Sequence, residues 1–305
     1  MSETVISSKI FSAPQQSERV GLRAPRWWRR FAQQPTALLG LALTISVVAL
    51  ALCAPLIAPG DPFKSVGEAL QAPSTAHWLG TDDLGRSVLA QLVHGARVSL
   101  FVGLAVALLS TSIGIVVGGL SGFFGGWVDD VLMRLTELVQ VMPRFFLAIL
   151  VAALFGGNTL TIVLLLGLTF WPSTARILRA QIFSLREREF VVAARAVGVP
   201  DYKILARHVL PNALPPIMVN AALQIGAAIL VEAGLSFLGL GDRSNVSWGY
   251  MINNAQPFLR LAWWMSVFPG LALLITVMGV NLLGDGLNDA LNPRLAPYRT
   301  GKGFI

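Results

Sequence analysis

Long apolar segments separated by short polar ones run through most of this chain of 305 residues. Because about 20 mainly apolar residues are enough for a helix to cross a bilayer, the pattern predicts an all-α integral membrane protein. Its six predicted spans cover residues 36–58, 98–122, 132–155, 159–177, 216–236 and 263–284. In the third span Arg134, Glu137 and Arg144 interrupt the apolar run, and Pro143 is expected to kink the helix.

Composition and charge agree with a membrane protein whose two termini lie inside. The chain is 54% hydrophobic and 13% charged, whereas soluble domains carry about 25% charged residues. With the N-terminus in the cytoplasm, most of the 23 Lys and Arg residues lie inside, including those of the 178–215 loop, as the positive-inside rule requires. The net charge of +7 is spread over loops and no nucleic-acid-reading motif occurs, so no nucleic acid partner is expected.

The same pattern divides the chain into four regions. Residues 1–30 show no apolar period and are expected to form a flexible cytoplasmic tail. Residues 31–97 hold the first span and an external loop. Residues 98–292 form a core of five spans, which includes a cytoplasmic loop at 187–211, and residues 293–305 form a cytoplasmic C-terminal tail.

Small residues and buried charges suggest how the spans pack. A ridge of glycines at four-residue steps lets two helix backbones approach closely; the neighbour is either a helix of the same chain or a partner subunit. Glu137 can pair with Arg134 three residues earlier. Glu232 has no partner nearby in sequence, and we expect it to form a structural hydrogen bond near the outer end of the fifth span. The glycines of the ridge are Gly114, Gly118 and Gly122.

The segment 187–216 is unusually polar for a chain of this kind, and its pattern predicts two short helices joined by a turn. Phe190, Ala193, Ala194 and Val197 recur at three- and four-residue steps and mark one apolar face with small residues. Such a face suits insertion into the groove of another protein; an amphipathic element lying on the membrane surface is the alternative.

Helix signals set the limits of these two helices. Glu187 and Glu189 are placed in the first turn of the first helix, where negative charge is favourable. Gly198 ends this helix, and Pro200 with Asp201 starts the next. Pro211 is expected to stop the second helix.

The segment resembles the EAA loop of the membrane subunits of ATP-binding-cassette importers. That pattern is Glu-Ala-Ala, three residues, Gly, nine residues, Ile, one residue, Leu-Pro. This chain departs from it at Val192, in the position of the Glu, and at His208, in the position of the Ile. The matching residues are Ala193, Ala194, Gly198, Leu210 and Pro211.

Three further stretches resemble the dipeptide/oligopeptide group of these permeases, of the DppC/OppC type. The segment HWLGTDDLGRSVLAQLVHGARVSL (77–100) resembles the entry to the second span, although Ser87 replaces an Asp that is usual there. LSFLGLG (235–241) with SWG (247–249) resembles the end of span five and the loop after it, where Asp242, Arg243 and Ser244 replace a proline-rich stretch. Span six and the tail match through AWW (262–264), FPG (268–270) and NLLGDGLNDALNPR (281–294).

The resemblance implies a six-span permease of the ABC type I importer fold in a prokaryotic inner membrane. It implies as partners a second permease of the DppB/OppB type, two cytoplasmic ATPase subunits that hold ATP and Mg²⁺, and an external solute-binding protein. The coupling segment would dock on the ATPase, with Glu189 a candidate to replace the missing Glu. The expected docking residues are Glu189, Phe190, Ala193, Ala194, Arg195, Gly198, Asp201, Arg207, Leu210 and Pro211.

Motifs that would support other functions are missing from the sequence. No GxxxxGK[ST] occurs, so ATP hydrolysis must belong to another polypeptide. His77, His94 and His208 are scattered without ligand spacing, and no metal site or catalytic set is expected. Cys53 lies in an apolar run and is expected to be a buried, inert thiol. An ion-coupled secondary transporter, a membrane enzyme and a receptor are rival hypotheses, and nickel complexes or glutathione-like solutes are alternatives to peptides as the substrate.

Overall fold

The computed structural model describes residues 26–291, which leaves most of the two predicted tails outside it. Within this range the secondary structure is helical, apart from two isolated bridges, between Ser65 and Arg86 and between Thr81 and Ser87. The elements are α1 (Arg26–Phe31), α2 (Pro35–Leu52), α3 (Ala54–Ile57), α4 (Val88–Phe124), α5 (Gly126–Val141), α6 (Arg144–Phe155), α7 (Thr159–Arg186), α8 (Glu189–Ala196), α9 (Asp201–Ile204), the π-helical turn η1 (Leu205–Val209), α10 (Leu210–Phe237), α11 (Trp248–Ala255), the 3₁₀ turn η2 (Gln256–Phe258) and α12 (Trp264–Leu291).

Five helical segments are long and apolar enough to cross a membrane, and a bent pair brings the number to as many as six. The five are α2, α4, α7, the continuous segment Asp201–Phe237 and α12. The bent pair is α5 and α6, which meet at 74°. Pro143 was predicted to kink one helix. It separates two, because the residue before a proline is driven out of the helical region, and Met142 is extended with ψ of 126°.

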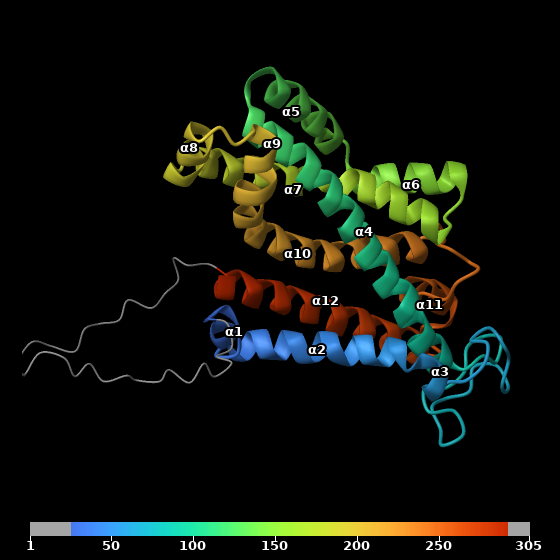
Figure 1. Ribbon diagram of the computed structural model, residues 1–305. Helices are drawn as coiled ribbons and strands as arrows, with labels where there is room; N and C mark the ends of the chain where they lie inside the picture. Colours follow the sequence, from blue (N-terminus) through green and yellow to red (C-terminus); the bar gives the residue numbers. More distant parts are fainter. Residues whose placement is uncertain (1–25, 292–305) are drawn as a thin grey trace, which may run out of the picture.

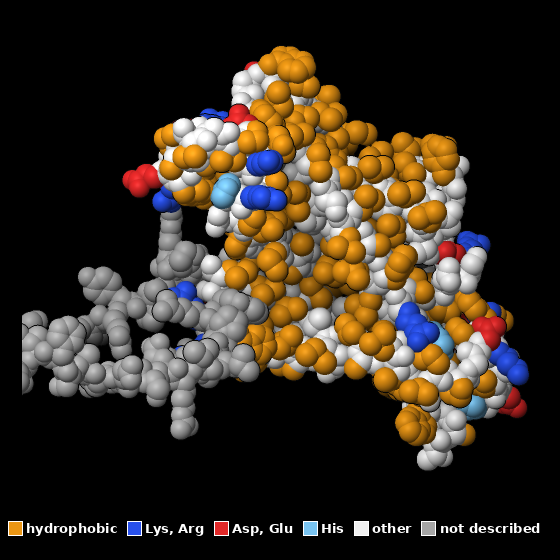
Figure 2. All heavy atoms as spheres, in the orientation of Figure 1, with side chains coloured by type: hydrophobic (Ala, Val, Ile, Leu, Met, Phe, Trp, Pro, Cys, Tyr) orange, Lys and Arg blue, Asp and Glu red, His pale blue; other side chains and the backbone are white. Residues whose placement is uncertain are grey.

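The long helices form a bundle with two distinct ends. In Figure 1, α2, α12 and α10 run side by side, and α4 crosses them obliquely to pack along α7. The helices α8 and α9 lie at the same end of the bundle as α1 and the last turn of α12. The segment between α3 and α4 lies with α11 at the other end. Figure 2 shows hydrophobic side chains over the middle of the bundle and charged side chains gathered at the two ends.

The glycine ridge of α4 lies against α7 of the same chain. A Cβ atom on Gly114 would lie 2.4 Å from Cβ of Thr174, and one on Gly118 would lie 2.4 Å from the carbonyl oxygen of Ala175. On Gly122 it would lie 2.9 Å from the carbonyl oxygen of a further α7 residue. The absence of side chains therefore brings the two backbones into direct contact over three helical turns.

Two sequence expectations about helix ends are wrong. Pro211 does not stop a helix, because the chain is helical without interruption from Asp201 to Phe237. The wide π turn of η1 directly precedes Pro211, and it accommodates a ring that would clash with the preceding turn of a regular α-helix. Glu187 does not lie in the first turn of α8, because α7 extends to Arg186 and Glu187 forms its C-cap.

The charged residues in the apolar segments make the contacts that were predicted, whereas Cys53 does not lie where it was expected. Arg134 pairs with Glu137 at 3.4 Å, as predicted. Glu232 is buried, and its Oε1 accepts hydrogen bonds from Ser236 at 2.7 Å and Ser247 at 2.8 Å, as expected for a structural role. Cys53, which we expected to be buried, is exposed, because α2 ends at Leu52 and Cys53 forms its C-cap.

Candidate functional site

The short helix α8 is held on the bundle by one buried apolar side chain. Val191 is fully buried, 0% exposed. It packs in a cluster of buried residues from α4, α7, α9 and α10, among them Phe123, Ile182 and Ile204. Arg188 is the N-cap of α8, and Glu189 lies in its first turn. The sequence periodicity had grouped other residues of this helix and not Val191, so the anchoring role of Val191 was missed.

The apolar face that the sequence singled out is directed away from the bundle. Phe190 is 42% exposed and Val197 is 83% exposed, and Ala193 is exposed between them. Ala194 is half-buried and packs at the edge of the Val191 cluster. The helix therefore presents a small, apolar and solvent-accessible surface that no residue of 26–291 covers.

A tight turn requiring glycine joins α8 to α9. Gly198 has a φ of +82°, which L-amino acids with a side chain rarely adopt. The Gly198 amide donates to the carbonyl of Arg195, and the Val199 amide donates to the carbonyl of Ala194, at 3.1 Å. These bonds satisfy the carbonyls at the end of α8 in the way of a glycine-ended helix. Pro200 is then the N-cap of α9.

The two arginines among the expected docking residues lie in different surroundings. Arg195 forms an ion pair with Asp201 at 3.1 Å, and its guanidinium lies 5.5 Å from the ring centroid of Phe123 on α4. Arg195 therefore ties α8 to α9 and to the bundle. Arg207 is exposed on η1 and points into no cluster of the described chain. At the start of α10, Leu210 is half-buried and Pro211 is exposed.

A polar hollow adjoins α8 and was not foreseen from the sequence. Its volume is about 850 Å³, and it lies between the end of α7, the start of α8 and the start of α10. Two carboxylates, one arginine and an aromatic ring line it, so a partner could make both ionic and apolar contacts there. The lining residues are Leu185, Glu187, Arg188, Glu189, Phe190 and Asn212.

A partly buried ion pair joins the helices that lead to α8. Asp129 on α5 accepts from Nε and Nη2 of Arg179 on α7, and from the hydroxyl of Ser121 on α4. The ring of Phe183 lies between two guanidinium groups, 4.6 Å from that of Arg179 and 4.3 Å from that of Arg186. Three helices are thus joined just before α7 ends. Sequence analysis missed this pair because its members are 50 residues apart.

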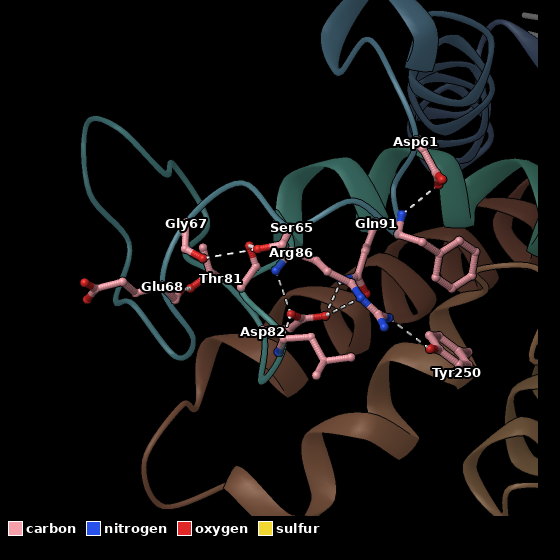
Figure 3. Close-up of polar contacts among 12 residues, drawn as sticks. Asp61, Ser65, Gly67, Glu68, Thr81, Asp82, Arg86, Gln91 and Tyr250 are labelled. Atoms are coloured by element: carbon pink, nitrogen blue, oxygen red, sulfur yellow. Dashed lines mark hydrogen bonds and ion pairs between the residues drawn. The ribbon is translucent and has the colours of Figure 1, made fainter.

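At the other end of the bundle, the segment between α3 and α4 is organised by Asp82 (Figure 3). The buried Asp82 carboxylate accepts from the backbone amides of Leu84 and Arg86 and, at 2.6 Å, from Nε2 of Gln91. Arg86 donates to the hydroxyl of Tyr250 on α11 at 3.3 Å. Burial, and then the charge of Asp82, raise the pKa of the neighbouring Asp83. These hydrogen bonds give the segment a defined fold and attach it to α11.

Asp242, which stands where the resemblance led us to expect a proline-rich stretch, caps the N-terminal end of α7. Its Oδ2 accepts from the amide of Thr159 at 3.0 Å and from its hydroxyl at 2.7 Å, and Asn245 and Ser244 donate as well. Burial raises the pKa of Asp242, but the hydrogen bonds outweigh it and hold the pKa at about 2. Beside it lies a polar hollow of about 290 Å³ lined also by Arg243, Tyr250 and Asn253.

No group of three or more His, Cys, Asp or Glu side chains within residues 26–291 is arranged to hold a metal ion. An exposed helix is joined at both of its ends to long apolar helices.

Comparison with known proteins gives consistent results. Residues 114–297 match the family model described as binding-protein-dependent transport system inner membrane component. Residues 25–73 match the N-terminal transmembrane domain of oligopeptide transport permease C.

Two similar relatives and one solved structure extend these matches. The dipeptide transport system permease protein DppC of Alkalihalophilus pseudofirmus is 36% identical over 88% of this chain and 89% of its own length. The oligopeptide transport system permease protein OppC of Bacillus subtilis is 35% identical over 92% and 93%. The fold is similar to that of the inward-facing MetNI methionine ABC transporter, with a TM-score of 0.53, 20% identity and coverage of 66% of this chain and 96% of that one.

Proposed function

Because this chain belongs to the family of inner membrane components of binding-protein-dependent transport systems, we propose that it moves di- or oligopeptides with energy from separate ATPase subunits. It is a multi-pass permease subunit of the ABC importer class with the corresponding fold. The observation that carries the coupling part of the proposal is α8. Its apolar face is exposed at one end of the bundle, although its other face is anchored by a fully buried valine.

The proposed assembly pairs this chain with a second, related permease. Two ATPase subunits, which bind ATP and Mg²⁺, lie against the end of the bundle that carries α8, and a solute-binding protein lies at the opposite end. The chain supplies half of the translocation pathway. In this arrangement both termini and α8 are cytoplasmic, which the basic residues of the inner loops support.

Movement of the ATPase subunits is transmitted through two connections of α8. Towards α7 the link is only Glu187 and Arg188. Towards α10 it is the turn at Gly198, followed by the uninterrupted helical segment Asp201–Phe237. Because both connections are short or helical, a displacement of α8 moves both long helices. The permease then has two states whose balance the ATPase sets from a distance.

The proposed contact surface is centred on Phe190, Ala193 and Val197. Ala193 leaves room for a closely approaching partner, and the hollow next to Phe190 offers the acidic side chains of Glu187 and Glu189. Val192, in the position where the importer pattern has Glu, is 57% exposed. We therefore expect apolar contact at that position, with the acidic contact supplied from Glu189.

Substitution of Ala193 by tryptophan tests the docking proposal. The whole importer is expressed, solubilised and purified by a tag on this chain. Ala193→Trp places a bulky ring on the exposed face without disturbing the Val191 anchor, so we expect about tenfold less ATPase subunit in the complex. Ala76→Trp, at an exposed position at the opposite end of the bundle, is the matched control and should recover the wild-type amount.

Two results would contradict the proposal. Wild-type recovery of ATPase subunits with Ala193→Trp would show that α8 docks elsewhere, for example on the membrane surface. ATP-independent peptide uptake by the chain alone in liposomes would reopen the ion-coupled transporter hypothesis.

A further inference from the structure

Arg144 is a half-buried charged residue in the apolar part of the chain, at the break of the bent helix pair. It is the first residue of α6, directly after the break at Pro143. Its guanidinium lies 5.0 Å from the ring centroid of Phe170 on α7. Phe170 follows Thr159, where α7 begins, by eleven positions, which is about 16 Å along a helix. This distance is about half the roughly 30 Å thickness of the hydrocarbon core of a bilayer, so Arg144 lies beside the middle of the apolar helix α7 and not beside its ends.

Arg144 has no negatively charged partner among residues 26–291. The contact that its guanidinium makes is with the Phe170 ring. By contrast, Arg134 on α5 pairs with Glu137, and Arg179 on α7 pairs with Asp129. The buried carboxylate of Glu232 is occupied through one oxygen by two serines and forms no contact with Arg144. A counter-ion for Arg144 would therefore have to come from outside residues 26–291.

The surroundings of Arg144 are open in this chain. Arg144 itself is half-buried, but Phe146 beside it is 74% exposed, and Met142 on the other side of the break is exposed as well. Burying an unpaired guanidinium in lipid is unfavourable, so a charged side chain at this depth faces protein or water. Arg144 thus lies at the surface of this chain and faces the space that we assign to the partner permease and the translocation pathway.

We propose that Arg144 binds the C-terminal carboxylate of the peptide as it passes through the membrane. The planar guanidinium can donate two parallel hydrogen bonds to a carboxylate, which lysine cannot do in the same way. When no peptide is present, the face of Phe170 stabilises the cation. This inference rests on the proposed function, because it takes a peptide to be the substrate. A carboxylate of the partner permease has the same chemistry and is the competing source.

The test compares two substrates that differ only in this carboxylate. The complete importer is reconstituted in liposomes with its binding protein outside, and peptide uptake is measured per ATP hydrolysed. One substrate is an alanyl dipeptide with a free C-terminus and the other is its C-terminal amide. We expect Arg144→Gln to lower uptake of the free dipeptide per ATP by about fivefold or more, to leave uptake of the amide within about twofold, and Arg144→Lys to fall between Gln and wild type.

Arg134→Gln is the matched control, because it removes an arginine of the neighbouring helix whose partner is Glu137. It should leave the ratio of the two substrates unchanged. Equal losses for both substrates, or no loss for either, with Arg144→Gln would overturn the proposal. Loss of the second permease from the purified Arg144→Gln complex would also overturn it, since the carboxylate would then belong to the partner. If the wild-type importer shows no ATP-driven uptake of either substrate, the proposed function itself is wrong.

Discussion

The close contact between the glycines of α4 and the backbone of α7, here called the glycine seam, gives the sharpest prediction about stability. At Gly118, a Cβ atom would lie 2.4 Å from the carbonyl oxygen of Ala175 and 2.9 Å from its Cα. Both are backbone atoms, so no side-chain rotation relieves the clash. At Gly119, one position later in the same helix, a Cβ atom meets nothing within 4 Å. Gly118→Ala and Gly119→Ala are therefore chemically identical changes in two different environments.

The expected size of the effect follows from these distances. An ordinary contact needs at least 3.4 Å, so Gly118→Ala must move α4 and α7 apart by about 1 Å, and such overpacking costs about 1–3 kcal/mol. At both positions alanine also gains up to about 1 kcal/mol over glycine from helix propensity. Gly119→Ala keeps that gain without a clash. The two variants should therefore differ by about 2 kcal/mol, which corresponds to about 3 °C in apparent Tm for a chain of this length.

The assay is the fraction of monodisperse protein that remains after heating in detergent, measured by size-exclusion chromatography at one heating time for all samples. A fixed protocol is required because membrane proteins unfold irreversibly and their apparent Tm depends on rate. Gly118→Ala should unfold at a lower temperature than wild type, and Gly119→Ala at the same or a higher temperature. Equal apparent Tm values for the two variants would refute the argument that α4 and α7 are in backbone contact.

Two further predictions concern the two ends of the bundle. Because the pKa of Asp242 in the folded protein, about 2, is below the ordinary value of 3.8, its contribution is complete above pH 3.8 and is lost as the pH falls towards 2. Asp242→Asn should therefore lower the apparent Tm by the same amount from pH 8 to pH 5, equivalent to about 0.5–1 kcal/mol for this half-buried cap. A difference from wild type that grows or shrinks in this pH range would contradict the assignment. Val191→Ala removes apolar atoms that are fully buried, so it should speed amide hydrogen exchange in α8 by about tenfold through easier local opening. Val192→Ala, at the exposed neighbouring position, should not change exchange, and equal effects would exclude Val191 as the anchor.

The apolar pattern predicted most of the fold because membrane spans are determined by local composition. The lengths of the apolar runs gave the number and approximate place of the spans, and the proline at 143 marked the break in the third. The limits of the helices were less predictable. Where the apolar run ends after residue 177, α7 continues to Arg186, because polar residues at the bundle end can pack on neighbouring helices as well as face water.

Features that depend on distant residues could not be predicted. Asp129 and Arg179 carry no local signal of their pairing, which arises only when α5 folds back along α7. The error at Pro211 has a different origin. Proline rules describe a regular α-helix, whereas a π turn supplies the extra space that the ring needs. In the coupling segment, three of the four residues that the periodicity grouped are exposed, but Ala194 packs beside Val191, and only the structure shows that Val191 holds α8 in place.

The internal connections determine which parts of the permease can move together. Gln224 of α10 accepts from Ser110 of α4 and donates to Ser173 at 3.1 Å and Thr174 at 2.8 Å on α7. Together with the glycine seam, these buried bonds join α4, α7 and α10 into one body, and α8 is attached to that body at both ends. The chain is most easily bent at another place, the 74° break before Arg144, where the helix is interrupted between α5 and α6. A displacement imposed on α8 should therefore move α4, α7 and α10 as a unit and be absorbed at the α5–α6 break, which is where Arg144 is available to a passing carboxylate.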